Sequence, residues 1–256
     1  MVAYRRFSAE IEALARAWST SAVSTDTWTP TGRSWGTNSN PIMVANQNAL
    51  QGVAKPGSPR PDKVLRAANE KICSDLAYVL NLPIPPVTLW DRGEGFVGER
   101  YCCISAWAFA QCVEWPAAVP KLSPAQLAQA GYIAGAMKVF DTWTASSDRK
   151  NDHVLVADDG DASSLGLAYI DYAFSLSYEW GGGAGPQPDP RPHWPSVAFE
   201  QQAVVATITA IEGIHEQGIL EIVRRVPVEY LPDGVKTAIQ SQLLGRRPSL
   251  RRWFGI

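Results

Sequence analysis

Hydrophobic residues recur at steps of three and four along residues 62–80, which predicts an amphipathic helix. The apolar face of this helix consists of Leu65, Ala68, Ile72, Leu76 and Val79. The helix is expected to end near residue 80, because Pro83 disfavours a helical conformation in the residue before it. This segment is the clearest helix that the sequence predicts.

Short apolar runs predict strands on both sides of this helix. The expected strands cover residues 41–45, 50–54, 87–90, 96–104, 154–157 and 167–170. The first two are separated by a polar turn and are expected to form a hairpin, and the last two are expected to form another. Residues 19–40 are rich in Ser, Thr, Gly and Trp, which indicates turns and an irregular or hairpin segment.

Helices are expected at residues 6–18, at residues 123–143, and as two or three segments after about residue 197. Ser123 is the expected N-cap of the second of these, with Pro124 at the first helical position. The chain thus has a strand-rich N-terminal part that holds one long helix, followed by a helical part that one pair of strands interrupts. Two parts of such different character imply a cleft between them, which is a common location for ligands.

Composition and charge narrow the class of protein. Of the 256 residues, 46% are hydrophobic and 19% are charged, which is ordinary for a globular chain with a substantial core. The formal net charge of −2 gives no electrostatic reason to expect a nucleic-acid partner. No segment reaches the run of about 18–20 apolar residues that a membrane-spanning helix needs. These observations predict a soluble, cytoplasmic protein without a transmembrane segment.

The four cysteines lack the spacing of a zinc site or a disulfide framework. Cys102 and Cys103 are adjacent on an expected strand, so their side chains are expected to point to opposite faces. With Cys73 and Cys112, they are expected to be free thiols in a reducing cytoplasm.

The segment with the most evident chemistry covers residues 146–172 and reads SSDRKNDHVLVADDGDASSLGLAYIDY. Asp148 follows an expected helix, and Asp171 ends the second strand of the expected hairpin, so both carboxylates are expected at one edge of it. Such a pair suits phosphoryl transfer, because one carboxylate can orient or deprotonate a hydroxyl while the other holds Mg²⁺. On spacing alone, both could instead be loop aspartates that cap helices or turns.

Several motifs resemble the kinase group that contains the HipA-like and the phosphatidylinositol 3- and 4-kinases, and most closely the bacterial relatives of type II phosphatidylinositol 4-kinases. DRKNDHVLV followed by IDYAFSL resembles the catalytic loop and the metal-binding segment of that group. VAKP at residues 53–56 resembles the strand with the ATP-binding lysine, and RAANE at residues 66–70 resembles the start of the main helix. LNLPIP at residues 80–85 resembles the connection that follows.

The resemblance implies an α+β, two-lobed, protein-kinase-like fold in a single domain. The small strand-rich N-lobe would cover about residues 1–105, and the helical C-lobe would cover about residues 106–256. The implied activity is transfer of the γ-phosphate of ATP to a hydroxyl, and we rank a protein Ser/Thr acceptor above a lipid. Two alternatives remain: nucleotidyl transfer on the same scaffold, and a pseudokinase that binds nucleotide or a partner as a scaffold.

The resemblance also implies roles for individual residues. Asp148 would be the catalytic aspartate, and Asp171 would be the principal metal ligand. Lys55 would contact the ATP phosphates, Glu70 would orient Lys55 through an ion pair, and Arg149 would hold the loop. The alternatives are that Lys55 is a solvated lysine at a strand end and that Glu70 is an exposed carboxylate on a helix.

One position departs from the family pattern. The family has Asn five residues after the catalytic aspartate, as a second metal ligand, and this chain has His153. A neutral imidazole binds Mg²⁺ poorly but suits Mn²⁺. Asn151 or Asp152 could take over from nearby, the activity could be weak, or His153 could simply be a partly buried loop residue.

The resemblance places the adenine pocket where the strand over residues 96–104 enters the helical lobe, around residues 105–109. Backbone groups from Ser105 onward would contact the edge of adenine, and Val53 and Ile170 would sandwich its ring. Residues 31–39 contain Gly and Ser, but they do not form a GxGxxG motif, and they are expected to cover the phosphates.

Overall fold

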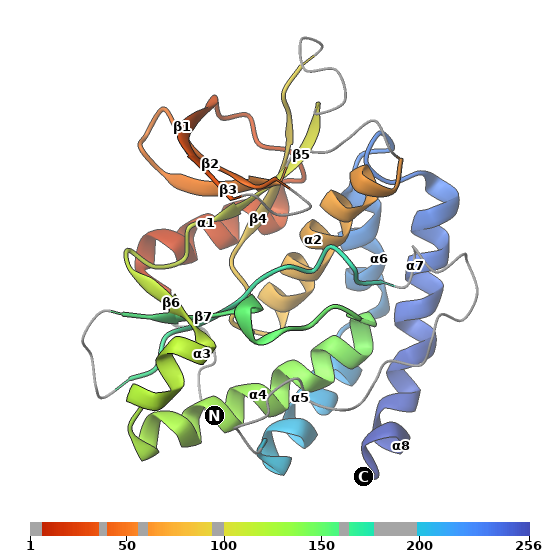
Figure 1. Cartoon of the computed structure of the whole chain (residues 1–256). Helices are drawn as coiled ribbons and strands as arrows, with labels where there is room; N and C mark the ends of the chain where they lie inside the picture. The colour runs from red at the N-terminus through yellow and green to blue at the C-terminus, as the bar shows by residue number, and fades with distance from the viewer. Residues whose placement is uncertain (1–6, 36–39, 56–60, 94–99, 159–163, 177–198) are drawn as a thin grey trace.

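The computed structural model describes residues 7–35, 40–55, 61–93, 100–158, 164–176 and 199–256 (Figure 1). A strand-rich part forms one end of the molecule, and a larger, mainly helical part forms the other (Figure 1). The expected α+β architecture with two unequal lobes is confirmed. Residues 36–39 and 96–99, which belong to two of the expected segments, lie outside the described residues.

The N-terminal part is an antiparallel five-stranded sheet with two helices. Its elements are α1 (Ala9–Thr20), β1 (Trp28–Ser34), β2 (Ile42–Asn46), β3 (Gln51–Lys55), α2 (Pro61–Val79), β4 (Val87–Asp91) and β5 (Tyr101–Ala106). The strand order is β1-β2-β3-β5-β4. The hairpin of β2 and β3 is confirmed, and the irregular segment before it contains β1 as an edge strand.

Side-chain alternation gives this sheet two different faces. Cys102 and Ile104 pack with α1 in a small apolar cluster, whereas Cys103 belongs to the large cluster shared with the helical part. The prediction that Cys102 and Cys103 point to opposite faces is therefore confirmed, and both are buried free thiols. On β3, Ala54 is buried in the small cluster, so Val53 and Lys55 point to the face that meets the helical part.

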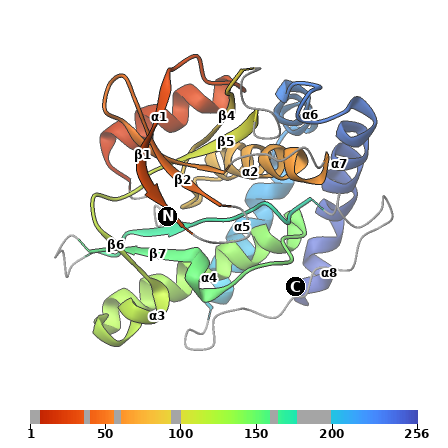
Figure 2. The ribbon, with the colours of Figure 1, turned by 45° about the horizontal axis from the view of Figure 1, so that its top comes forward.

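Helix α2 lies between the five-stranded sheet and the helical part (Figures 1 and 2). It contacts β4, β5, α1 and α6, and its predicted apolar residues Ile72 and Leu76 are fully buried. Lys71 and Asp75 are buried on the same helix, where Lys71 Nζ donates to both Asp75 carboxylate oxygens at 2.7 and 2.8 Å and to the Trp18 carbonyl at 2.7 Å. These bonds join α2 to the end of α1.

The C-terminal part contains most of the helices and a second, three-stranded sheet. Its elements are β6 (Cys112–Glu114), α3 (Trp115–Ala118), η1 (Val119–Lys121), α4 (Pro124–Thr144), η2 (Asn151–His153), β7 (Val154–Ala157), β8 (Leu167–Tyr169), α5 (Gln201–Gly213), α6 (Glu216–Arg225), α7 (Asp233–Arg246), η4 (Arg247–Ser249) and α8 (Leu250–Phe254). Helix α4 begins at the predicted N-cap Ser123, which forms a capping box with Gln126: each side chain accepts from the backbone N–H of the other residue.

Three expectations for secondary structure need correction. The first helix starts at residue 9 rather than 6, because Ser8 is its N-cap and accepts from the Ile11 N–H at 3.3 Å. Strand β6 was not expected, since three residues are too short to show an alternation; it pairs with β7 next to the expected hairpin of β7 and β8. After residue 197, the described residues form α5, α6, α7 and the short α8, one helix more than expected.

Within the described ranges, none of the helices combines the length and the hydrophobicity that crossing a lipid bilayer requires.

Candidate active site

Lys55, Glu70 and Asp171 meet where the five-stranded sheet faces the helical part. Lys55 is the last residue of β3, and its Nζ forms an ion pair with Glu70 of α2. The same Nζ lies 2.9 Å from Asp171 Oδ1. Glu70 is buried and the Lys55 side chain is only 19% exposed, so the alternatives of an exposed helix carboxylate and a solvated lysine are both wrong.

The two carboxylates keep Lys55 charged. Burial alone would lower the pKa of Lys55, but Glu70 and Asp171 outweigh burial and raise this pKa above its usual value. Burial would also raise the pKa of Asp171, but Lys55 and, to a smaller extent, His153 lower it to about 2. At neutral pH, the site therefore contains a permanent ammonium next to an ionised Asp171.

Helix α2 also holds the backbone that follows β8. The other carboxylate oxygen of Glu70 accepts from the Tyr172 N–H at 3.0 Å. The buried Asn69 donates to the Ala173 carbonyl at 2.9 Å. No role was expected for Asn69; the only sequence signal for it was its place in the segment that resembles the start of the kinase main helix.

Asp171 has a backbone conformation that few residues other than glycine adopt. Its φ is +66°, in the left-handed region, where Asp is tolerated better than most residues. The contacts of Glu70 and Asn69 with the next two residues hold the chain in this conformation. Such strained positions often occur at functional sites, where the backbone directs a side chain toward a ligand.

Arg149 fixes the segment before Asp171 from the other side, as expected for a residue that holds the loop. Its guanidinium donates to Asp141 of α4 at 3.0 Å and to the Ile170 carbonyl at 2.7 Å. It also lies 4.4 Å from the centre of the Tyr172 ring, a cation–π contact. Arg149 is 4% exposed, so this contact set is well shielded from solvent.

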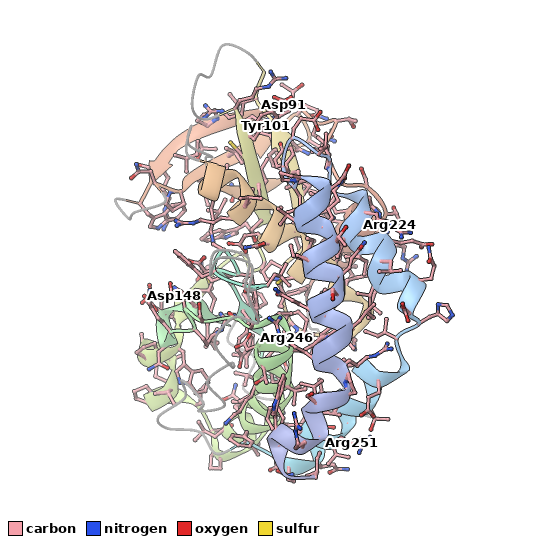
Figure 3. All side chains as sticks on the ribbon, turned by 90° about the vertical axis from the view of Figure 1, so that its right-hand side faces the viewer. Asp91, Tyr101, Asp148, Arg224, Arg246 and Arg251 are labelled. Atoms are coloured by element: carbon pink, nitrogen blue, oxygen red, sulfur yellow. The ribbon has the colours of Figure 1, made fainter. Side chains whose placement is uncertain are left out.

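Asp148 lies in the loop after α4, on the side of the molecule opposite Arg224 of α6 (Figure 3). Its carboxylate pairs with Lys150 at 2.9 Å, and it caps neither a helix nor a turn in the described structure. The preceding Ser147 donates its backbone N–H to the Phe174 carbonyl at 3.2 Å, which brings this loop beside the segment after Asp171. The Asp148 side chain is 36% exposed, so it is accessible from solvent.

His153 lies next to Asp171, with its Nε2 3.6 Å from Asp171 Oδ2. Burial lowers the pKa of His153 below its usual value, against the opposite effect of Asp171, so the imidazole is neutral at pH 7. Its Nδ1 is buried and has no hydrogen-bond partner in the described part of the chain. A neutral imidazole beside an ionised carboxylate is a donor set that fits one divalent cation.

This donor set is small. Within the described residues, no group of three or more His, Cys, Asp or Glu side chains is arranged to hold a metal ion. Two protein ligands are nevertheless what a nucleotide-bound Mg²⁺ or Mn²⁺ usually has, because phosphate oxygens and water complete its coordination. Asp171 and His153 therefore fit a cation that is bound together with a nucleotide.

Two of the three residues expected to contact adenine, Val53 and Ser105, lie on the face of the five-stranded sheet that carries Lys55. Val53 and Ser105 are directly paired across β3 and β5, and both are partly exposed. Ile170 immediately precedes Asp171, is also partly exposed, and donates its N–H to the His153 carbonyl at 2.9 Å. The structure thus places the three residues on elements that adjoin the Lys55–Asp171 ion pair.

A cavity of about 860 Å³ lies beside the segment that follows β5. Trp107 and Phe109 line it, together with the start of α1 around Ile11, but Lys55 and Asp171 do not. It therefore borders the segment expected to contact adenine without including the ion pair.

Comparison with known proteins identifies the fold. No protein-family model matches the chain, and a search of curated proteins finds no match. Among solved structures, the chain is similar to the Helicobacter pylori proinflammatory kinase CtkA, with a TM-score of 0.60 and 13% sequence identity. The similarity covers 89% of this chain and 94% of the CtkA chain. The chain therefore has a kinase-like fold.

Proposed function

We propose that this protein is an ATP-dependent phosphotransferase that moves the γ-phosphate of ATP to a hydroxyl. The observation that carries the proposal is the contact of Lys55 Nζ with both Glu70 and Asp171. Lys55 comes from β3, Glu70 from α2 and Asp171 from the segment after β8. Because the Lys55 ammonium is paired with two carboxylates, it stays charged although little of it is exposed to solvent. The kinase-like fold supports the same function.

In this proposal, Lys55 binds phosphate oxygens. Its charge is maintained by Glu70 and Asp171, which raise its pKa. Glu70 is buried and is bonded to the Tyr172 N–H, so it stays in place and orients the ammonium. Because Lys55 is held in advance, little conformational entropy is lost when phosphate binds.

Asp171 and His153 would hold Mg²⁺ or Mn²⁺, which supplies positive charge to the phosphates when it is bound. The low pKa of Asp171 keeps the carboxylate free of a proton, and the lowered pKa of His153 avoids a positive charge beside the cation. The partly buried position of both side chains strengthens their interaction with a cation, since water screens it less.

Asp148 would act on the acceptor. Its carboxylate accepts the proton as the O–H bond of the acceptor breaks and the acceptor oxygen bonds to the γ-phosphorus, while the bond from that phosphorus to ADP breaks. We propose a protein Ser or Thr as acceptor. The 36% exposure of Asp148 and the 54% exposure of Lys150 support access for a large substrate.

The test is nucleotide binding followed by product analysis. Thermal unfolding is measured with ATP and with Mg²⁺ or Mn²⁺ for wild type, Lys55→Met, Asp171→Asn and Asp148→Asn. We expect a metal-dependent rise in Tm for wild type that Lys55→Met and Asp171→Asn lose, whereas Asp148→Asn keeps the rise but loses phosphate transfer. Lys236→Met is the matched control, because Lys236 pairs with Asp233 on α7. No rise in Tm for wild type would refute the proposal.

His153 favours one further candidate, a pseudokinase that binds nucleotide without transferring phosphate. His153 occupies the position at which the family has a metal-binding Asn, and its side chain is buried next to Asp171. A nucleotide-dependent rise in Tm without transfer to any acceptor, and without gain from His153→Asn, would support this candidate. An added mass of AMP rather than phosphate would identify nucleotidyl transfer instead.

A further inference from the structure

Trp35 and Trp107 stack on each other, although they follow different strands of the N-terminal sheet. Trp35 follows β1, and Trp107 follows β5. Their ring centres are 6.4 Å apart, and the planes differ by 24°. This spacing and tilt are those of an offset aromatic stack. Both side chains are only partly buried, so part of the aromatic surface is open to solvent.

Strand alternation puts this stack on the face of the sheet that carries Lys55. Trp107 continues the ladder after β5, because its N–H donates to the Gln51 carbonyl at 3.0 Å. Val53 pairs with Ser105, and Lys55 pairs with Cys103, so every second residue of β5 points to the same face as Lys55. Trp107 is next in that series.

Trp35 reaches the same face from the other end of the sheet. Ser34 pairs with Ile42, and Ile42 pairs with Ala54, whose side chain points to the opposite face. The Trp35 N–H donates to the Pro41 carbonyl at 3.1 Å, which continues this pairing by one residue. Alternation therefore turns Trp35 toward the face of Lys55, in agreement with its contact with Trp107.

Arg33 adds a positive charge to the stack. Its guanidinium carbon lies 4.9 Å from the centre of the Trp35 ring and 5.7 Å from that of Trp107. Arg33 itself is exposed. A guanidinium over two indoles presents a flat, electron-rich and cation-flanked surface, which suits a planar heterocycle better than an aliphatic or a hydroxyl group.

We propose that Trp35 and Trp107, flanked by Arg33, bind the purine base of the nucleotide by aromatic stacking. This inference rests on the proposed phosphotransferase function, because Lys55 on the same face would hold the phosphates. Val53 and Ser105 would contact the base from the sheet, and Ile170 from the segment after β8. The Trp35–Trp107 stack, named here the indole pair, is thus the element that distinguishes a purine nucleotide from a bare polyphosphate.

The experiment separates the two halves of the ligand. Affinities for ATP, adenosine and inorganic tripolyphosphate are measured by calorimetry for wild type, Trp35→Ala, Trp107→Ala and Arg33→Gln. Base stacking on an aromatic side chain contributes enough that we expect a loss of about 5- to 100-fold for ATP and adenosine in the tryptophan variants. Tripolyphosphate affinity should stay within about twofold of wild type, since it has no base to stack.

Two controls match the variants. Trp253→Ala removes a tryptophan that is also partly buried, on α8 in the helical part, and should change none of the three affinities. Arg92→Gln removes another cation–π contact, which Arg92 makes with Trp90 at 5.3 Å on β4, the other edge strand. If an alanine variant fails to fold, Trp35→Phe and Trp107→Phe replace it, and quenching of tryptophan fluorescence by adenosine should then decrease in each.

Each outcome decides the inference. Selective loss of ATP and adenosine binding supports it. An equal loss of affinity for all three ligands means that the indole pair only supports the fold. Unchanged adenosine affinity means that the base binds elsewhere. Either result overturns the inference while the phosphotransferase function stands. Loss confined to tripolyphosphate would make the cluster a phosphate site and would also overturn it. If wild type binds none of the three, the proposed function fails and the inference fails with it.

Discussion

Lys55 Nζ lies 2.9 Å from Asp171 Oδ1, although 116 positions separate the two residues in the chain. The contact joins the end of β3 to the turn after β8, and Glu70 of α2 completes it. The Lys55 ammonium group thus connects three separate segments: β3, α2 and the turn after β8. Because the two carboxylates raise the pKa of Lys55 and Lys55 lowers that of Asp171, the ion pair makes stability depend on pH.

We expect Asp171→Asn to lower stability at pH 7 by up to about 2 kcal/mol and to have little effect near pH 2. The pKa of Asp171 is lowered from 3.8 to about 2 in the folded protein. A lowered folded pKa contributes stability above the unfolded pKa, and this contribution is lost as pH falls from about 4 to 2. Urea unfolding at pH 7, 4 and 2.5 measures it, with Asp233→Asn as control, because the Asp233 side chain is 84% exposed. If the difference in free energy of unfolding between wild type and Asp171→Asn does not decrease at low pH, the expectation is wrong.

His153→Asn is expected to shift the metal preference toward Mg²⁺. The neutral imidazole next to Asp171 favours Mn²⁺, whereas an amide oxygen suits the harder Mg²⁺. The readout is the rise in Tm with ATP in each metal, expressed as the ratio of the Mg²⁺ effect to the Mn²⁺ effect. His215→Asn serves as control, because His215 is an exposed N-cap of α6. An unchanged ratio would argue against His153 as a metal ligand.

The buried Lys71–Asp75 pair is expected to be needed for stability, since it joins α2 to the end of α1. Asp75→Ala should destabilise the protein by about 3–5 kcal/mol, because it leaves Lys71 buried without its counter-charge. The double variant Lys71→Met/Asp75→Leu should recover most of that loss. Urea unfolding checks both, and a double variant as unstable as Asp75→Ala would be the contrary result. Lys236→Met, which breaks a pair whose Asp233 side chain is 84% exposed, should cost at most about 1 kcal/mol.

Gly135→Ala is expected to lower the free energy of unfolding by about 1–3 kcal/mol, because it disturbs the packing where α4 crosses α5. A Cβ at this position would lie 2.8 Å from the Glu200 carbonyl oxygen and 3.3 Å from the Ala203 Cβ, so the two helices would have to separate. Gly245→Ala on α7 is the matched control: a Cβ there meets no described atom within 4 Å, and alanine should stabilise the helix by up to about 1 kcal/mol. If the Tm of both variants shifts in the same direction in thermal unfolding, close packing at Gly135 does not explain the effect of alanine there.

Local patterns predicted most of the elements. The apolar period of α2, the capping box of α4 and the hairpins of β2–β3 and β7–β8 all follow from interactions between residues close in sequence, so the sequence carries their signal directly. The pairing of Lys55 with Glu70 was expected only from the resemblance to kinases, and the structure contains it. The sequence does not predict β6, because three residues are too few to show an alternation of apolar and polar positions. The strand forms by pairing with β7.

Contacts between distant segments depended on how the elements pack. Nothing in the spacing of residues indicates that Asn69 holds the Ala173 carbonyl, or that Trp35 stacks on Trp107. These contacts arise because strand pairing sets which side chains share a face, and because burial on α2 brings β3 and the segment after β8 within reach of one another. Periodicity specifies which side of an element is apolar, whereas the partner that covers that side is selected by the packing of the whole chain.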